Sequence, residues 1–263
     1  MNASIDEKKL AVWLGEVPAV DARVQVFAFP YAGGSPSVFR GWQDLPGHNL
    51  QLVPIALPGR EKRMGEPFPE SVASIAGELA EAVLAHARPP YILLGLCFGA
   101  CVAFEVGRIA ERAGLPPAGL VVAGSRAPHT PPPVPVYGLS QDEFIRILHD
   151  LRFIPDEIFA LPELLEMFLP QLRADFLMDE RYRCADALPC CSFPVQVMFG
   201  KRDTITPREQ GRAWSECTSA VCGYREYPGD QLFFAAFAEQ FLAETDRFAR
   251  MWTSPAEGMG DGS

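Results

Sequence analysis

Several features that define whole classes of proteins are scarce or missing in this sequence of 263 residues. The longest uncharged apolar run, 91–104, is interrupted by glycines and is too short to span a bilayer. The first residues mix acidic and basic side chains and lack a basic start followed by an apolar block, so no secretory signal is expected. We therefore predict a cytoplasmic protein without a membrane anchor.

Metal-binding and disulfide patterns are also lacking. The four histidines are scattered, and no CxxC motif pairs with a second one, so no metal site is expected. The seven cysteines are odd in number, and Cys190 and Cys191 are adjacent, which does not suit a disulfide framework. The net charge is −10, and the single short basic cluster is Arg60, Lys62 and Arg63, which argues against a nucleic-acid surface.

What the sequence does contain is a large amount of apolar material, 48% of all residues, arranged in alternating strand-like and helix-like segments. This alternation predicts an α/β fold with a mostly parallel central sheet flanked by helices. Strands are expected at 23–29, 52–57, 91–94, 119–123, 195–199 and 224–227, and helices at 71–87, 99–113, 207–217 and 232–251. The predicted core covers 1–138 and 183–252, and 253–263 is expected to be a flexible tail.

The segment 139–182 interrupts the alternation because its pattern is helical throughout. Ser140 and Glu143 are spaced as a capping box, and Pro155, Pro162 and Pro170 are expected to divide the segment into short helices. An all-helical insertion between two strands suggests a lid over a site. The alternative is an ordinary packing layer.

The strongest chemical signal is the pentapeptide Gly95-Leu96-Cys97-Phe98-Gly99, between a predicted strand and a predicted helix. Glycines two residues either side of a nucleophile permit a sharp turn that lifts the nucleophile above the sheet. We expect the backbone NH of Phe98 to face the same site, and the helix N-terminus to lower the pKa of the Cys97 thiol. The simpler interpretation is a small buried residue in a tight turn.

Two further segments follow predicted strands and could complete such a site. In Phe29-Pro30-Tyr31-Ala32-Gly33-Gly34, an NH from Ala32 or its neighbour could pair with that of Phe98 as an oxyanion hole. Asp203 follows another strand and places a carboxylate at the sheet edge where sites of α/β proteins collect. The alternatives are a simple glycine turn and a residue near a helix N-terminus.

Together these segments resemble the type II thioesterases of polyketide and nonribosomal peptide synthesis, in the α/β-hydrolase superfamily. The resemblance also covers LPGREKRMGEPF, GSRAPHTPPP, LRADF and the late YPGD. It implies a nucleophile at Cys97, an acid at Asp203 and a third catalytic position at Gln231, with cysteine replacing the usual serine and glutamine replacing the usual histidine. It also implies an acyl or peptidyl carrier protein as partner, no cofactor of its own because the substrate is carried on phosphopantetheine, and a monomer.

Gln231 cannot accept a proton near neutral pH, so it cannot serve as the general base of a triad. A cysteine can attack as a thiolate, so we predict an acyl-Cys97 intermediate that is released to a nucleophile other than water, by acyl transfer or cyclisation. The alternatives are an editing thioesterase that hydrolyses aberrant acyl groups and a catalytically silent scaffold that binds carriers. A further interpretation is that Cys97 or Gln231 was introduced to trap an intermediate.

Other residues could substitute for the missing base. His149 lies in the helical insertion, His129 lies in a loop after a strand, and Asp230 is adjacent to Gln231. Each is a candidate, although each also has a structural interpretation. For carrier docking, the basic cluster Arg60, Lys62 and Arg63 is the suggested patch.

Overall fold

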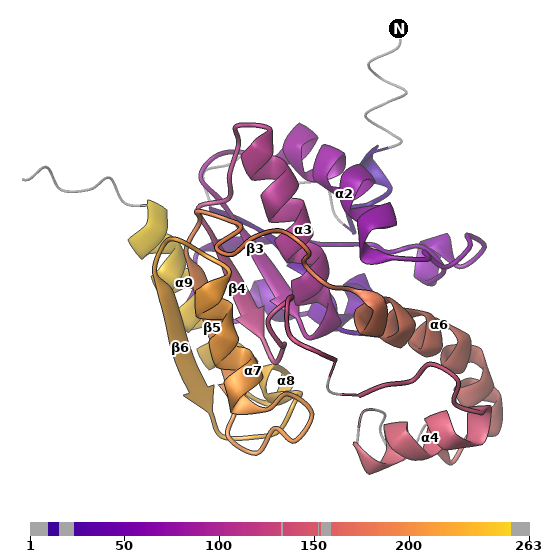
Figure 1. Ribbon diagram of the computed structural model, residues 1–263. Helices are drawn as coiled ribbons and strands as arrows, with labels where there is room; N and C mark the ends of the chain where they lie inside the picture. Colours follow the sequence, from indigo (N-terminus) through magenta and orange to yellow (C-terminus); the bar gives the residue numbers. More distant parts are fainter. Residues whose placement is uncertain (1–9, 16–23, 133, 152, 154–158, 254–263) are drawn as a thin grey trace, which may run out of the picture.

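A computed structural model describes residues 10–15, 24–132, 134–151, 153 and 159–253. Within them, six strands form one parallel sheet in the order β2-β1-β3-β4-β5-β6 (Figure 1). The four inner strands are almost entirely buried, as is typical of a parallel sheet covered on both faces. The strands are β1 (Val24–Phe29), β2 (Leu50–Pro54), β3 (Tyr91–Leu96), β4 (Gly119–Ala123), β5 (Val195–Gly200) and β6 (Cys222–Tyr227).

The predicted parallel sheet is therefore confirmed, and all six expected strands overlap observed ones. The largest shift is in β2, which begins two residues before the expected start and ends at Pro54 rather than at Leu57. Residues Ile55 and Leu57 are as buried as the strand itself, so their apolar character did not mark its end.

Helices cover both faces of the sheet. On one face, α2 (Val72–His86) and α3 (Phe98–Arg112) pack on one hydrophobic core together with the segment around the buried Trp214. On the other face, α8 (Phe233–Ala236) and α9 (Ala238–Thr253) enclose a second core. The remaining core helices are α7 (Arg208–Arg212) and the 3-10 turns η1 (Pro36–Phe39), η2 (Trp42–Asp44), η3 (Glu61–Arg63) and η4 (Ala213–Glu216).

Helix boundaries follow the signals in the sequence closely. Ser71 caps α2 by accepting a hydrogen bond from the NH of Ser74 at 3.0 Å. Gly114 adopts φ +80° just after α3, the left-handed conformation that ends many helices. By contrast, the single helix expected at 207–217 is a short α-helix continued by a 3-10 turn, and the one expected at 232–251 is divided between α8 and α9.

The insertion contains α4 (Gln141–Asp150) and α6 (Pro162–Arg181), which extend to one side of the sheet in Figure 1. The expected capping box of Ser140 and Glu143 is present. The expected break at Pro170 is wrong, because this exposed proline lies inside α6, where water can bind the carbonyl that its missing NH leaves free. Pro162 instead begins that helix, and Pro155 lies outside the described residues.

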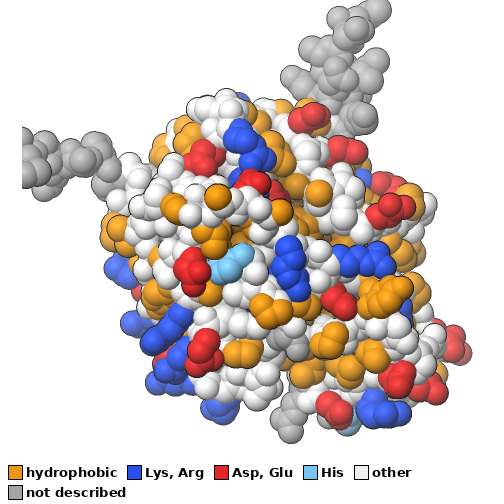
Figure 2. Space-filling model, in the orientation of Figure 1, with side chains coloured by type: hydrophobic (Ala, Val, Ile, Leu, Met, Phe, Trp, Pro, Cys, Tyr) orange, Lys and Arg blue, Asp and Glu red, His pale blue; other side chains and the backbone are white. Residues whose placement is uncertain are grey.

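The outer surface of the insertion carries several exposed apolar side chains. Leu161, Met167 and Phe168 are 51%, 53% and 37% exposed, and Figure 2 shows hydrophobic side chains gathered over the region of α4 and α6. None of the helices in the described ranges combines the length and the apolar character that crossing a membrane requires. The predicted tail falls almost wholly at 254–263, outside the described residues.

Candidate active site

Cys97 occupies the turn between β3 and α3 and has a strained backbone. Its φ of 48° and ψ of −120° lie in a region that non-glycine residues rarely adopt. The turn is held by hydrogen bonds from the Cys97 NH to the Ala123 carbonyl, at 2.8 Å, and from the Ala100 NH to the Cys97 carbonyl, at 2.9 Å. Strain of this kind is retained at nucleophile elbows, so the sharp turn expected from the sequence is present.

The two elbow glycines are required by close backbone approaches. A Cβ on Gly95 would overlap the Cα of Ala100. A Cβ on Gly99 would lie 2.5 Å from the carbonyl oxygens of both Phe29 and Pro30, nearer than real Cβ atoms come. The start of α3 is therefore in direct contact with the loop that follows β1, as a shared oxyanion hole requires.

The environment of the Cys97 sulfur corrects one expectation. Burial raises the pKa of the Cys97 thiol to about 12, and the negative charge of Asp179 adds to the increase. Hydrogen bonds from the Gln231 side chain and the Phe98 backbone NH oppose this rise, but they do not overcome it. The predicted low pKa is therefore wrong, because desolvation of the thiolate outweighs the helix N-terminus, and the resting residue is a neutral thiol.

Gln231 is buried and directs its amide nitrogen at acceptors. Its Nε2 donates to the Gly124 carbonyl at 2.6 Å, and its side chain also reaches the Cys97 sulfur. Its Oε1 faces the hydroxyl of Thr206 at 3.5 Å. An amide in this arrangement can donate to a thiolate, but it has no basic nitrogen with which to remove a proton.

Asp203 keeps one carboxylate oxygen without a partner. Oδ1 accepts hydrogen bonds from the NH groups of Ile205 and Thr206 at 2.8 and 3.0 Å, so Asp203 does stabilise the turn before α7. Oδ2 is buried and has no hydrogen-bond partner within the described part of the chain. Burial raises the pKa of Asp203 to about 6, partly offset by those two NH groups.

The remaining candidate residues are distributed around this centre. Ala32 is buried in the loop after β1, which touches the start of α3, and Phe98 donates its NH toward the sulfur. Their pairing as an oxyanion hole stays a prediction. Asp230 contributes to the raised pKa of Asp203, and its Oδ1 accepts the Leu232 NH at 3.1 Å.

The structure does not bring either suggested histidine to Cys97. His129 directs Nδ1 at the sulfur of Cys217, 3.4 Å away, and Nε2 at Glu216, also 3.4 Å away. His149 is exposed on α4 beside Asp150. All four histidines lie in the described ranges, and none of the ring contacts they make there involves Cys97.

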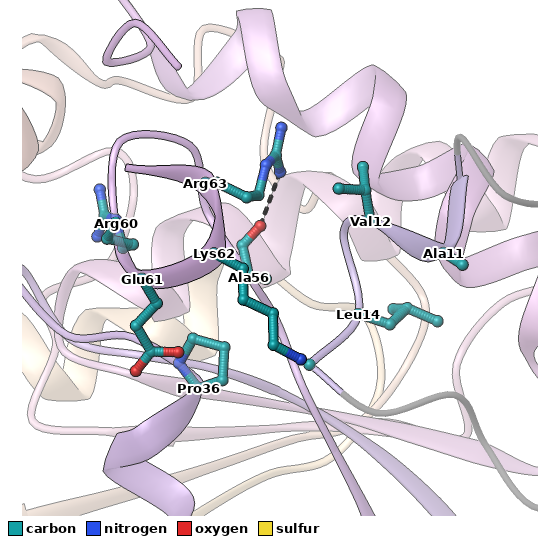
Figure 3. Close-up of a pocket in the computed structure, with 10 residues that line it drawn as sticks. Ala11, Val12, Leu14, Pro36, Ala56, Arg60, Glu61, Lys62 and Arg63 are labelled. Atoms are coloured by element: carbon teal, nitrogen blue, oxygen red, sulfur yellow. Dashed lines mark hydrogen bonds between the residues drawn. The ribbon is translucent and has the colours of Figure 1, made fainter. Parts of the chain in front are cut away.

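The suggested basic docking patch is wrong for two of its three residues. Arg60 is only 3% exposed and is bound to Asp175, and Arg63 stacks on Trp13 and binds Glu66. Lys62 is exposed and lines a cavity of about 220 Å³. Figure 3 shows Arg63 turned back to the Ala56 carbonyl, which it binds at 2.8 Å.

Two contributors to the site were missed in the sequence. Thr206 links Asp203 to Gln231, and the signal that could have indicated it is Asp203, a residue type that often binds the backbone NH groups that follow it in a turn. Asp179, which raises the pKa of Cys97, comes from the far end of α6 and accepts the Cys101 thiol at 3.5 Å. No pattern in the sequence indicated Asp179. Among the described residues, no cluster of three or more potential ligands could hold a metal.

Comparison with known proteins identifies the family. Residues 24–248, which contain the elbow, Asp203 and Gln231, match the family model described as the thioesterase domain. The chain belongs to the thioesterase family.

Individual relatives agree with this assignment. The chain is 32% identical to "Linear gramicidin dehydrogenase LgrE" of Brevibacillus parabrevis over 91% of its own length and 93% of the relative's. It is 34% identical to "Thioesterase PikA5" of Streptomyces venezuelae over 82% of its own length and 77% of that protein's.

Among solved structures, the thioesterase resembles YbtT, a type II thioesterase from the yersiniabactin NRPS/PKS pathway. The TM-score is 0.81 at 31% identity, over 90% of this chain and 97% of the other. The predicted α/β-hydrolase fold is thereby confirmed.

Proposed function

We propose that this thioesterase acts on acyl or peptidyl thioesters carried on the phosphopantetheine of a carrier protein in nonribosomal peptide or polyketide synthesis. The family match and the likeness to a type II thioesterase of such a pathway support this substrate class. The enzyme needs no cofactor of its own for this chemistry, since the substrate arrives already activated as a thioester.

The first chemical step is attack by the Cys97 sulfur on the thioester carbonyl. The new S–C bond of acyl-Cys97 forms, the S–C bond to phosphopantetheine breaks, and the leaving thiolate takes up the equivalent of the proton that Cys97 loses. NH groups of Phe98 and Ala32 would bind the carbonyl oxygen as it becomes negative. Because the resting thiol has a raised pKa, this step is limited by the small fraction of thiolate.

Release of the acyl group then depends on its acceptor. Gln231, which the resemblance places at the position of the family's histidine, directs an NH₂ group at the sulfur and at Gly124, and therefore cannot activate water. This arrangement is the observation that carries the proposal. It favours transfer to a thiol, or to an amine or carbanion within the acyl chain, since these are stronger nucleophiles than water. A hydroxyl of the same acyl chain would be favoured over water by its proximity to the acyl-sulfur bond.

Editing hydrolysis is the second candidate, and one contact favours it. The free Oδ2 of Asp203 belongs to a carboxylate with a pKa of about 6, which is ionised at neutral pH and able to accept a proton. A water molecule held between this oxygen and the acyl-sulfur bond would receive some activation.

The substrate proposal is tested by incubating the protein with an acyl-loaded carrier and measuring its intact mass. We expect the acyl mass on Cys97 and none on Cys97→Ala, with Cys222→Ala as a matched control that still becomes loaded. Carrier binding without any mass increase would instead identify a silent scaffold and refute the proposed enzyme.

A further inference from the structure

The Gly33-Gly34 backbone, which follows the candidate oxyanion residue Ala32, is held by a buried ion pair. Arg60 and Asp175 are 3% and 0% exposed and form two parallel contacts, Nη1 to Oδ2 at 2.8 Å and Nη2 to Oδ1 at 2.9 Å. Asp175 lies in α6 of the helical insertion, whereas Arg60 lies immediately before η3.

Both partners also bind the glycine backbone directly. Asp175 Oδ2 accepts the Gly33 NH at 2.7 Å, and Arg60 Nη1 donates to the Gly34 carbonyl at 3.0 Å. Gln171, one turn earlier in α6, donates Nε2 to the Gly33 carbonyl at 2.6 Å. The peptide groups on both sides of Gly33 are thus fixed by side chains of α6, and the peptide group after Gly34 is fixed by Arg60.

A second contact from the same loop holds the far end of this segment. Glu61 adopts φ 46°, an unusual value for a non-glycine residue, and its carboxylate accepts the Ser35 hydroxyl at 2.5 Å and the Ser37 NH at 3.3 Å. Figure 3 shows its carboxylate beside Pro36. Arg60 and Glu61 together therefore hold residues 34–37 by hydrogen bonds.

The glycine segment has little freedom on its other sides. Gly33 has φ +75°, and the Leu172 side chain occupies the space where a Cβ would lie. The residues just before it, Phe29 and Pro30, touch Gly99 of the elbow. The segment is therefore enclosed between the start of α3 on one side and α6 with Arg60 on the other.

A buried ion pair of this kind rarely stabilises a fold more than apolar side chains of the same volume would, because both charges lose their hydration. Its value lies in directional bonds that apolar side chains cannot make. Oxyanion donors must be placed within a few tenths of an ångström, and a misplacement of about 1 Å can cost a factor on the order of 100 in rate.

We propose that the Arg60–Asp175 pair positions the backbone of residues 32–34, the part of the loop after β1 that carries the candidate oxyanion donor. The placement of the Ala32 NH then depends on helix α6 of the insertion. Arg60, Asp175 and Gln171 are positioning residues, since they act through the peptide groups of Gly33 and Gly34. Any displacement of α6 would consequently alter the oxyanion hole. The inference rests on the proposed acylation of Cys97.

The test replaces the pair by apolar residues in the double variant Arg60→Met/Asp175→Leu. It leaves no unpaired buried charge, but it removes the partners of the Gly33 NH and the Gly34 carbonyl. We therefore expect a folded protein whose urea midpoint is below the parent's and above that of either single variant. The rate constant for acylation of Cys97 at saturating acyl-carrier should nevertheless fall about 100-fold, while the half-saturating carrier concentration changes less than about threefold. Arg247→Gln/Glu244→Gln, which removes an exposed ion pair on α9, should leave both unchanged.

The rate of Cys97 alkylation by iodoacetamide distinguishes a misplaced oxyanion hole from a general disturbance of the site, because only the latter would change this rate. This reaction uses the thiolate but no oxyanion hole, so the double variant should alkylate at the parent's rate. Parental acylation in a folded double variant would overturn the proposal, and so would an equal fall in alkylation and acylation.

The same comparison with a p-nitrophenyl ester separates this inference from the substrate proposal. A parent protein that reacts with the ester but not with the acyl-carrier refutes the proposed substrate only. The double variant then still has to lose about 100-fold in ester acylation for the positioning role to stand.

Discussion

Replacing Gln231 by histidine should convert the protein into an efficient hydrolase. The side chain at 231 already reaches the Cys97 sulfur on one side and Thr206, which binds Asp203, on the other. An imidazole there would present Nε2 to the sulfur and donate its Nδ1 proton to Asp203 Oδ2, the buried oxygen that now has no partner. Asp203 is ionised above its pKa of about 6 and could hold that tautomer at pH 8.

The size of the effect follows from what the imidazole supplies. A well-placed general base contributes about 10²- to 10⁴-fold, so hydrolysis of acyl-Cys97 should accelerate by at least about 100-fold. The assay measures decay of the acyl-Cys97 mass at pH 8 in buffer without an acceptor. Most of the gain should disappear in Gln231→His/Asp203→Asn, whereas Asp203→Asn alone should change the slow parental decay little. An unchanged decay in a folded Gln231→His protein would refute the view that only a base is missing.

Three further predictions concern acylation, stability and the elbow. Because the Cys97 thiol has a pKa of about 12, the rate of its acylation by a carrier thioester should rise about tenfold per pH unit, or about 100-fold from pH 7 to pH 9. A rate that reaches a plateau below pH 8 in single-turnover loading would show that a base assists the thiol. Burial raises the pKa of Asp203 from 3.8 to about 6, so folding favours its protonated form and the protein loses stability as pH rises through that interval. Asp203→Asn should therefore raise the free energy of unfolding on the order of 2 kcal/mol at pH 8 and little at pH 4, and equal effects in urea titrations at the two pH values would contradict this. Gly99→Ala should lower the free energy of unfolding by more than about 2 kcal/mol and abolish acylation of Cys97, because its Cβ would meet the Phe29 and Pro30 carbonyls. Gly77→Ala is the control, since α2 leaves open space there, and it should raise the free energy of unfolding by about 0.5–1 kcal/mol.

The sequence predicted those parts of the molecule whose signals are local. Buried parallel strands consist of continuous apolar runs, and the Gly95 and Gly99 spacing marked the turn that carries Cys97, because these features depend on neighbouring residues alone. Pro170 was misleading, since an exposed proline can stay inside a long helix where water binds the carbonyl that it leaves free.

The chemical environment of the site was less predictable. The pKa of Cys97 depends on burial beneath other elements and on Asp179, more than 80 residues away along the chain. Likewise, Arg60 and Arg63 form a basic cluster in the sequence, but their side chains are buried and paired with the carboxylates of Asp175 from α6 and of Glu66. Desolvation by distant elements and the pairing of Arg60 with Asp175 have no local signature, whereas the Arg63–Glu66 pair spans only three residues.

The most direct test of the proposed chemistry follows the fate of one acyl group. Cys97 is loaded from an acyl-carrier, the carrier is removed, and the acyl-Cys97 mass is followed at pH 7.5 with and without N-acetylcysteamine. We predict that the adduct persists in buffer and is discharged by the thiol, with the acyl group recovered on the acceptor. Equal, rapid loss under both conditions, with the free acid as product, would contradict the claim that Gln231 leaves water unactivated.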